Sequence, residues 1–242
     1  MSLLEVSDVT VRFGGNLALD AVSLQVSAGS VTGLIGPNGA GKTTMFNVIT
    51  GLQPVDAGRV ALDGTDITGV RPFRRARAGI ARTFQRLESF GSMTVRENIL
   101  VAAEVRRDRD GAAPRMATDA LLDRLSLGDV ADERTEELPT GRARLVEIAR
   151  ALATRPKLLL LDEPASGLSE TEGDGLAVLL TELAQGGLGI LLVEHDVPLV
   201  MRVCAQIFVL DFGAVLASGS AREIQADRNV QEAYLGTTEV VA

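Results

Sequence analysis

Apolar and polar residues alternate along the first part of the chain, and a period of two is typical of β-strands. Two such runs occupy residues 6–11 and 22–26, and residues 13–16 provide a glycine-containing turn between them. Because strands joined by a short turn pair antiparallel, this part predicts a small antiparallel sheet. Residues 59–62 predict another strand, followed by a turn at 63–64.

Short continuous apolar runs further along the chain predict strands that are buried on both faces. They cover residues 30–35, 157–162, 189–194 and 207–211, and residues 79–85 are predicted to form a further strand. Helices are predicted at residues 42–50, 70–78, 95–103, 118–125, 143–153 and 174–184. Strands that alternate with helices predict an α/β fold with a mostly parallel sheet covered on both faces.

Helical periodicity dominates the middle of the chain and interrupts this alternation. We therefore predict one domain over residues 1–242, with an α/β core at approximately 1–86 and 156–242 and an inserted helical subdomain at approximately 87–155. A charged stretch at residues 106–114, inside the insertion, is expected to be mobile.

Composition narrows the classes of protein that remain. The chain has 242 residues, 46% of them hydrophobic, which favours a folded globule, and no apolar run reaches 18 residues, so no membrane span is expected. No signal peptide is expected at the N-terminus, and the single cysteine, Cys204, lies in an apolar pattern that favours buried packing in a reducing compartment. A net charge of −8 argues against general nucleic-acid binding.

The most informative motif is Gly-Pro-Asn-Gly-Ala-Gly-Lys-Thr at residues 36–43. It fits the pattern in which backbone N–H groups of a Gly-rich loop and of a helix start surround phosphate groups. Lys42 is one of only two lysines in a chain that otherwise uses arginine, as expected where a point charge must reach between phosphates. The alternative is a chance match, but the strand predicted before the loop and the helix predicted after it argue against that.

Two carboxylates, Asp162 and Glu163, follow four leucines of a predicted buried strand. In open α/β sheets, ligands bind beyond the carboxyl ends of the strands. At that place Asp162 is suited to hold magnesium bound to nucleotide phosphates, and Glu163 to orient or deprotonate an attacking water. The alternative is a solvated pair that caps the strand, and the phosphate loop makes it the weaker interpretation.

Three further side chains lie at predicted strand ends or turns. His195, the only histidine, follows the strand at 189–194 and is suited to contact a γ-phosphate, although a lone histidine is more often structural. Gln85 ends the strand at 79–85, and its amide suits magnesium or water. Phe13 either stacks on adenine or packs in its turn, and the sequence leaves both open.

The order of these motifs resembles the ATP-binding subunits of ABC transporters over essentially the whole chain. The most specific segment is 138–152, which looks like the family's signature motif and the helix that follows it. The stretches 80–85, 94–98, 194–196 and 232–236 resemble the ATPases of branched-chain amino acid importers. Urea and amide importers use similar ATPases, so the solute stays open.

The resemblance implies a P-loop NTPase core that binds and hydrolyses ATP with Mg²⁺. It also implies a peripheral subunit on the cytoplasmic face of the cell membrane, with transmembrane permease subunits, a second ATP-binding subunit that is identical or related, and indirectly a solute-binding protein as partners. Catalytic roles fall on Glu163, His195 and Gln85, and metal binding on Thr43, Gln85 and Asp162. The residues expected to bind the nucleotide are Phe13, Asn38, Gly39, Ala40, Gly41, Lys42, Thr43, Thr44, Thr140 and Gly141.

The signature motif departs from the family's usual Leu-Ser-Gly-Gly-Gln, because Pro139, Thr140 and Arg142 stand beside the retained Leu138 and Gly141. In this family, the signature of one subunit faces the phosphate loop of another. Pro139 removes an N–H donor and a serine hydroxyl, and Arg142 pairs either with phosphate or with a neighbour. Either the motif still closes on ATP, or it forms a weakened site within an asymmetric pair of ATPase chains.

Arginines gather around the predicted helix at 70–78 and the strand after it. One interpretation is a solvated face with local acidic partners, and the other is contact with phosphate headgroups or with the membrane partner. The cluster consists of Arg71, Arg74, Arg75, Arg77, Arg82 and Arg86.

The leading prediction is therefore the ATPase subunit of a membrane importer, most closely that for branched-chain amino acids. A small-molecule kinase shares the phosphate loop but needs an acceptor pocket, for which the sequence gives no signal. A soluble ABC-type ATPase usually carries two cassettes or long coiled-coil arms. A lipopolysaccharide exporter ATPase is the nearest alternative within the family.

Overall fold

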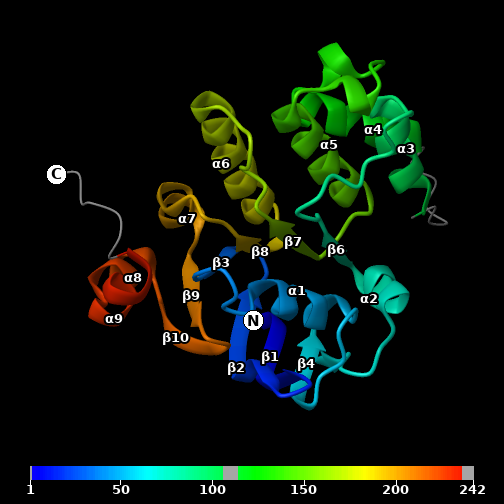
Figure 1. The fold of residues 1–242 in the computed structure, drawn as a ribbon. Helices are drawn as coiled ribbons and strands as arrows, with labels where there is room; N and C mark the ends of the chain where they lie inside the picture. The colour runs from blue at the N-terminus through cyan, green and yellow to red at the C-terminus, as the bar shows by residue number, and fades with distance from the viewer. Residues whose placement is uncertain (1, 106–113, 236–242) are drawn as a thin grey trace.

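The computed structural model describes residues 2–105 and 114–235, and its centre is a six-stranded sheet with helices on both sides (Figure 1). Its strands are β3 (Val31–Ile35), β6 (Ile80–Arg82), β7 (Leu158–Asp162), β8 (Gly189–Val193), β9 (Gln206–Asp211) and β10 (Ala214–Gly219). They lie in the order β10-β9-β3-β8-β7-β6. Only β10 pairs antiparallel, with β9, so the sheet is mostly parallel as the sequence predicts.

A second sheet of four strands is antiparallel and has the order β2-β1-β4-β5. It is formed by β1 (Ser2–Phe13), β2 (Asn16–Ser27), β4 (Ala57–Leu62) and β5 (Thr65–Asp66). The two longest of these strands are joined by the turn at residues 14–15, which confirms the hairpin expected from the alternating pattern.

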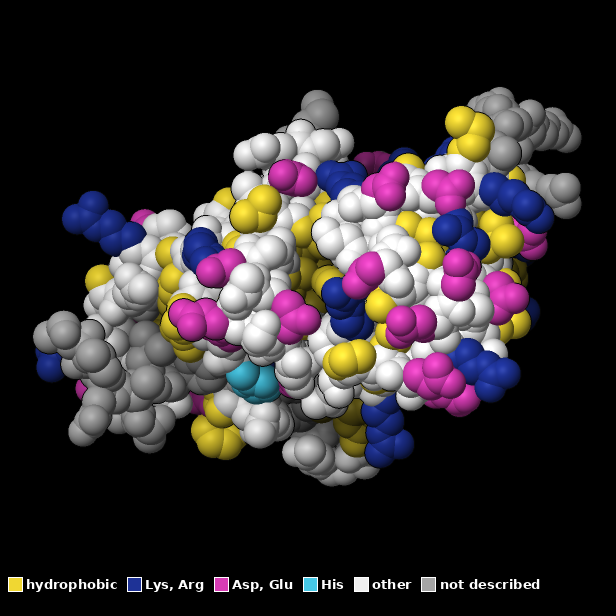
Figure 2. Space-filling model, turned by 90° about the horizontal axis from the view of Figure 1, so that it is seen from above, with side chains coloured by type: hydrophobic (Ala, Val, Ile, Leu, Met, Phe, Trp, Pro, Cys, Tyr) yellow, Lys and Arg dark blue, Asp and Glu magenta, His cyan; other side chains and the backbone are white. Residues whose placement is uncertain are grey.

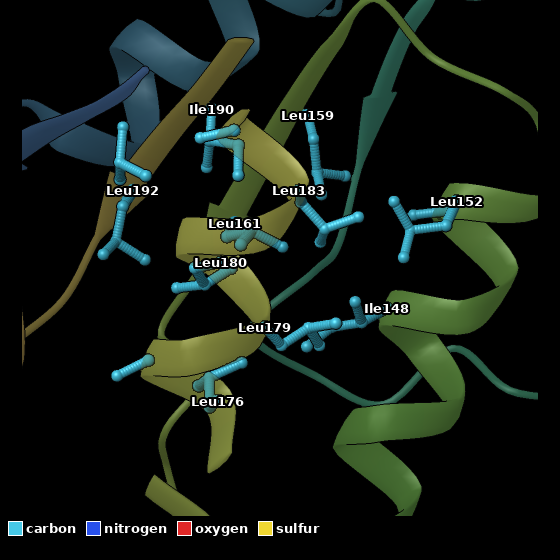
Figure 3. Close-up of a cluster of buried hydrophobic side chains, with 14 of the residues drawn as sticks. Ile148, Leu152, Leu159, Leu161, Leu176, Leu179, Leu180, Leu183, Ile190 and Leu192 are labelled. Carbon is cyan, nitrogen blue, oxygen red and sulfur yellow. The ribbon is translucent and has the colours of Figure 1, made fainter. Parts of the chain in front are cut away.

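Side chains of the central strands alternate between two apolar cores. On one face Leu159, Leu161, Ile190 and Leu192 belong to a cluster that includes residues of α5 (Thr140–Ala153) and α6 (Glu170–Gln185). Figure 3 shows Ile148 and Leu152 of α5, together with leucines of α6, in the same cluster as the side chains of these strands. This face of the sheet is therefore covered by α5 and α6.

The opposite face carries the other members of the alternation, such as Leu158, Leu160 and Leu191. They share a cluster with Phe46 of α1 (Lys42–Thr50) and with the apolar side of the antiparallel sheet. The helix after the Gly-rich loop and the helix that begins at Thr140 therefore pack on opposite faces of one sheet.

The remaining helices lie around this core. α3 (Val95–Val105) and α4 (Pro114–Arg124) stand with α5 at the upper right of Figure 1, as a helical group. The shorter elements are α2 (Pro72–Ala78), α7 (Val197–Val203), α8 (Ala221–Ala226), α9 (Arg228–Val230), η1 (Gly128–Val130), η2 (Thr135–Glu137) and η3 (Gln231–Leu235).

The helix predicted at 42–50 has these bounds, and Gly51 ends it with φ of +79°. The strand predicted at 79–85 is shorter, because β6 ends at Arg82, so the expectation that Gln85 ends a strand is wrong. The strand ends early because the backbone of Phe84 and Gln85 bonds to a side chain instead of a neighbouring strand. Arg144 of α5 donates to the carbonyl groups of both residues. The stretch expected to be mobile falls almost wholly on residues 106–113, which lie outside the described residues.

Cys204 is buried, and its position agrees with the packing that the sequence predicts. Burial raises the pKa of this thiol to about 12. Because the thiolate is the reactive form, a buried thiol with so high a pKa is inert at neutral pH.

One arginine of the cluster supports the phosphate-loop helix. Arg75, in α2, is buried and donates to the carbonyl oxygens of Val48 at 2.7 Å and Ile49 at 2.9 Å, in the last turn of α1. It also donates to the carbonyl oxygens of Thr68 and Val70. A cation at a helix C-terminus satisfies unpaired carbonyl groups and opposes the negative end of the helix dipole. For Arg75, the interpretation as part of a solvated face is wrong.

We predict that Arg75→Met lowers the free energy of unfolding by roughly 2–4 kcal/mol, because it removes the charged donor from several carbonyl groups at the buried end of α1. Thermal denaturation followed by circular dichroism measures the loss. Arg74→Met is the matched control, because Arg74 is exposed on the same helix. Equal melting temperatures for the two variants would contradict the capping role.

Candidate functional site

The Gly-rich loop at residues 36–43 connects β3 to α1 and is shaped by two tight contacts. A Cβ atom on Gly36 would lie 2.0 Å from the carbonyl oxygen of Leu210, and one on Gly41 would lie 2.8 Å from that of Ala18. Both glycines also have positive φ, of +147° and +105°. Glycine is therefore required at both positions by space and by backbone conformation.

Lys42 begins α1 and folds back over the loop. Its Nζ donates to the carbonyl oxygens of Gly36 at 2.6 Å and Pro37 at 3.0 Å. Burial lowers the pKa of Lys42, and the nearby carboxylates of Glu163 and Asp162 partly offset that effect. The predicted phosphate-binding lysine and the two predicted carboxylates thus share one site.

The first turn of α1 contains no acidic residue, and the N–H groups of such a turn have no acceptor within the helix. Those N–H groups and the positive end of the helix dipole favour an anion at this point. The predicted phosphate contacts Asn38, Gly39, Ala40, Thr43 and Thr44 lie on this loop and on the start of α1.

Glu163 follows β7 directly and sits at the centre of a side-chain cluster. Its Oε1 lies 2.9 Å from Nε2 of His195, and its Oε2 accepts from Nε2 of Gln85 at 3.3 Å. The three residues predicted to be catalytic are therefore in contact. The histidine side chain, cyan in Figure 2, is visible on the molecular surface in the view from above.

The pairing of β7 with β8 explains this meeting. Asp162 is the register partner of Val193, so the residues that follow each strand emerge at the same edge of the sheet. The backbone of Glu163 has φ of +50° and donates its N–H to the carbonyl oxygen of Val193 at 2.9 Å. A left-handed conformation costs a non-glycine residue roughly 1 kcal/mol, and here it occurs at the predicted catalytic carboxylate.

Glu194 is a residue of this site that the sequence reasoning did not single out. It is buried, and it accepts from the N–H groups of Ala165 at 2.7 Å and His195 at 3.0 Å. Burial raises its pKa, although these N–H groups act in the opposite direction. Its place directly after an apolar strand, next to the histidine, is the signal that could have identified it. The contacts connect the segment after Glu163 to the backbone of His195.

Asp162 is buried at the end of β7, and its Oδ2 accepts from Nη2 of Arg82 at 2.9 Å. No hydrogen bond to its Oδ1 occurs among residues 2–105 and 114–235, which leaves that oxygen for another ligand. Over the same described ranges no cluster of three or more His, Cys, Asp or Glu side chains could hold a metal. A free carboxylate oxygen is a ligand type that magnesium prefers, and Thr43 at the start of α1 offers a hydroxyl.

The signature segment lies at the start of α5, away from the Gly-rich loop. Thr140 is exposed, and a Cβ atom on Gly141 would lie 2.9 Å from Cδ2 of Leu168 in the same chain. Arg142 donates to Oδ1 of Asp129 at 2.7 Å, so it pairs with a neighbour. Because α5 and α1 pack on opposite faces of the sheet, the structure does not bring Thr140 and Gly141 to Lys42.

Phe13 lies at the end of β1 and is 51% exposed. About half of the residue is covered and half is open to solvent, so packing in its turn and stacking on adenine both remain open.

A groove of about 1040 Å³ lies on another part of the molecule. Its walls include Phe73 of α2, Phe84 after β6, Phe90, and Val101 of α3, all of them exposed. None of residues 36–44 lines it, so it is separate from the phosphate loop.

A Gly-rich loop that opens a helix, with an aspartate, a glutamate and a histidine at neighbouring strand ends, defines a P-loop nucleoside-triphosphatase. The chain belongs to the ABC transporter family, whose model matches residues 19–166. It is an ATP-binding, ATP-hydrolysing cassette subunit. A second model, described as a branched-chain amino acid ATP-binding cassette transporter, matches residues 214–240.

Curated relatives match over nearly their full length. The high-affinity branched-chain amino acid transport ATP-binding protein BraF of Pseudomonas aeruginosa is 40% identical, over 97% of this chain and 98% of its own. LivG of Escherichia coli K12, a protein of the same description, is 39% identical over the same shares. The lipopolysaccharide export system ATP-binding protein LptB of Haemophilus influenzae is 34% identical over 98% of both chains.

Solved structures show the same fold. MJ1267, an ATP-binding cassette of an ABC transporter, superposes with a TM-score of 0.88 at 33% identity, over 97% of this chain and 99% of its own. A dimeric structure of the bacterial ABC transporter cassette MJ0796 gives 0.81 at 26% identity, over 90% of this chain and 99% of its own. The described residues contain no helix that is long and apolar enough to cross a membrane.

We predict that Gly36→Ala weakens ATP binding at least about tenfold, because the new Cβ atom forces the loop away from Leu210. Isothermal titration calorimetry measures the affinity. Gly64→Ala is the matched control, since Gly64 also has positive φ but has no atom within 4 Å of the added Cβ. Equal ATP affinities in the two variants would show that the close approach at Gly36 does not shape the site.

Proposed function

We propose that the chain energises a membrane importer, with branched-chain amino acids as the transported solutes. The observation that carries this proposal is the assembled set of Lys42, Asp162, Glu163, His195 and Gln85 in a chain 40% identical to BraF over 97% of its length. Urea, amide or lipopolysaccharide transport is the alternative within the family. The 34% identity to LptB is the observation that supports lipopolysaccharide transport.

The nucleotide contacts follow from the loop geometry. Residues 38–44 present backbone N–H groups to the phosphates, Lys42 adds its positive charge between them, and Phe13 stacks on the adenine ring. Thr43, Gln85 and Asp162 would hold magnesium, which would neutralise phosphate charge.

Hydrolysis rests on the cluster around Glu163. Its carboxylate orients the attacking water and takes a proton from it. His195, in contact with Glu163, holds the side of the site where the γ-phosphate lies, and Gln85 contributes a neutral amide. Glu194 supports this geometry because its carboxylate accepts a hydrogen bond from the backbone N–H of His195 and so holds that backbone in place.

A complete site requires a second ATP-binding subunit. The chain's own Thr140 and Gly141 begin a helix on the face of the sheet opposite to α1, so they serve a phosphate loop of another subunit. The dimeric arrangement described for MJ0796 supports this proposal. Pro139 then weakens the partner's site and not the site of this chain, which favours an asymmetric pair.

The membrane partner is a transmembrane permease, and the groove that contains Phe73, Phe84 and Phe90 is its docking surface. An exposed apolar groove of about 1040 Å³ suits a protein partner. It lies between the α/β core, at approximately 1–86 and 156–242, and the helical subdomain at approximately 87–155. The subunit is peripheral, on the cytoplasmic face of the membrane, and a solute-binding protein acts on it indirectly through the permease.

We predict that two substitutions in the site affect different steps, one ATP binding and the other hydrolysis. Lys42→Ala weakens ATP binding about 10- to 100-fold because a charged hydrogen-bond donor to phosphate is lost. Glu163→Gln retains ATP but slows hydrolysis at least about 100-fold, and so accumulates a closed dimer. Calorimetry measures the affinity, and size-exclusion chromatography with light scattering in ATP measures the dimer.

An unchanged ATP affinity in Lys42→Ala would count against its assignment, and a monomeric Glu163→Gln protein at saturating ATP would contradict closure of this chain with itself. In a mixed pair with a second ATPase chain, the same Glu163→Gln substitution abolishes most of the turnover if this chain provides the active site. Unaffected hydrolysis in that pair would refute the proposed asymmetry.

The solute is tested in the assembled transporter. The ATPase is co-purified with its permease, reconstituted in proteoliposomes and supplied with its solute-binding protein. We expect leucine to stimulate ATP hydrolysis, with urea and lipopolysaccharide as matched controls. Stimulation by either control and not by leucine would replace the branched-chain assignment.

A further inference from the structure

Arg82 makes two partly buried contacts that the established activity does not explain. Its Nη2 donates to Oδ2 of Asp162 at 2.9 Å, and its Nη1 donates to Oδ1 of Asn47 at 2.6 Å. The side chains of Arg82 and Asp162 are only 6% and 7% exposed. One guanidinium thus joins β6 to the last turns of α1 and to the end of β7. This position differs from both sequence-based interpretations of the arginine cluster, since Arg82 is neither on a solvated face nor free for headgroups.

Aromatic rings hold the guanidinium as well. The centroid of the Phe46 ring lies 5.2 Å from Cζ of Arg82, and that of Phe84 lies 4.9 Å away. Cation–π contacts at these distances are attractive and restrict the plane of the guanidinium. A guanidinium bound by Asn47 and flanked by two rings is fixed in place, so it stays beside Asp162 when another ligand arrives.

The ion pair itself is a weak source of stability. A buried ion pair often contributes little net free energy, because both charges lose their hydration. The Nε of Arg82 is also buried and has no hydrogen-bond partner in the structure as described, which adds a further cost. A buried pair of small net stability beside a candidate metal ligand points to a role in positioning that ligand.

We propose that Arg82 is a positioning residue, which orients the carboxylate of Asp162 for magnesium. Arg82 engages Oδ2 only, and no residue of the described chain engages Oδ1. The adjacent Thr83 accepts from the backbone N–H of Asp162 at 3.2 Å, so consecutive residues fix the side chain and the backbone of the same aspartate. Partners that orient a metal ligand in this way commonly change metal affinity about 10- to 100-fold.

The same residue reaches the groove. Arg82 is one of its lining residues, and Phe84, which covers the guanidinium, is another. The ring that lines the groove is therefore one of the groups that hold the guanidinium beside Asp162. The inference rests on the proposed role of Asp162 in binding magnesium, and it adds the residue that sets the strength of that role.

Binding of Mn²⁺ to the ATP-loaded protein, followed by electron paramagnetic resonance, tests the proposal. All proteins carry Glu163→Gln so that ATP is not consumed. We expect Arg82→Met to raise the Mn²⁺ concentration for half-saturation about 10- to 100-fold while ATP affinity in EDTA stays unchanged. Arg82→Lys is expected to lose less Mn²⁺ affinity than Arg82→Met, because lysine keeps the positive charge but not the planar set of guanidinium donors. The control Arg74→Met, at an exposed position, leaves the Mn²⁺ affinity unaltered.

A double-mutant cycle with Asp162→Asn separates the possible outcomes. If Arg82 acts through Asp162, Arg82→Met causes no further loss of Mn²⁺ affinity once Asp162→Asn is present. Unchanged or tighter Mn²⁺ binding in Arg82→Met alone would overturn the proposal, as would an equal loss of ATP affinity in EDTA, which marks a general effect on the fold. If Asp162→Asn itself leaves Mn²⁺ binding unchanged, the metal role of Asp162 fails, and the inference falls with it.

Discussion

The register of the parallel strands is the constraint on which the site depends. β7 pairs with β8 so that Asp162 lies opposite Val193, and β3 pairs with β8 on its other side. Parallel strands end at one edge of a sheet, and ligands of such sheets bind there. The loop after β3, the carboxylates after β7 and the histidine after β8 therefore meet, although they are far apart in the sequence. A shift of one residue in either pairing would turn the alternating leucines to the wrong core and separate these groups.

The phosphate loop and the signature segment lie at the starts of helices on opposite faces of the sheet. One face carries α1, with the phosphate loop at its start, and the other carries α5, with the signature segment at its start. Both helix starts suit a phosphate, but a sheet stands between them. This division is the reason for our proposal that a single chain, although it holds most of the candidate catalytic side chains, works with a second subunit. Long arginine side chains join neighbouring elements on each side of the sheet. Arg75 and Arg82 contact α1, and Arg144 joins α5 to the segment after β6.

Local patterns predicted the fold well because each followed from a local cause. The helix at 42–50 begins after a Gly-rich loop and ends at Gly51, which adopts the left-handed conformation that glycine tolerates. Strand alternation and the apolar runs likewise located both sheets. The cluster of Glu163, His195 and Gln85 was foreseen because strand ends converge, even though β6 ends before Gln85. By contrast, the partners of Arg75 and Arg82 were not foreseen. Their acceptors are backbone carbonyls and side chains brought close only by tertiary packing, which leaves no periodic signal in the sequence.

The central claim is that each nucleotide is bound by the phosphate loop of one subunit and the signature of another. Mixing two variants tests it most directly, with Glu163→Gln in both and light scattering in ATP as the readout. One carries Lys42→Ala, and the other carries Thr140→Asp, which puts a negative charge at the exposed start of α5. The account predicts that neither variant dimerises alone and that the mixture does, because the mixed pair holds one unsubstituted phosphate loop facing one unsubstituted signature segment. A mixture that stays monomeric while the Glu163→Gln parent dimerises would contradict the account.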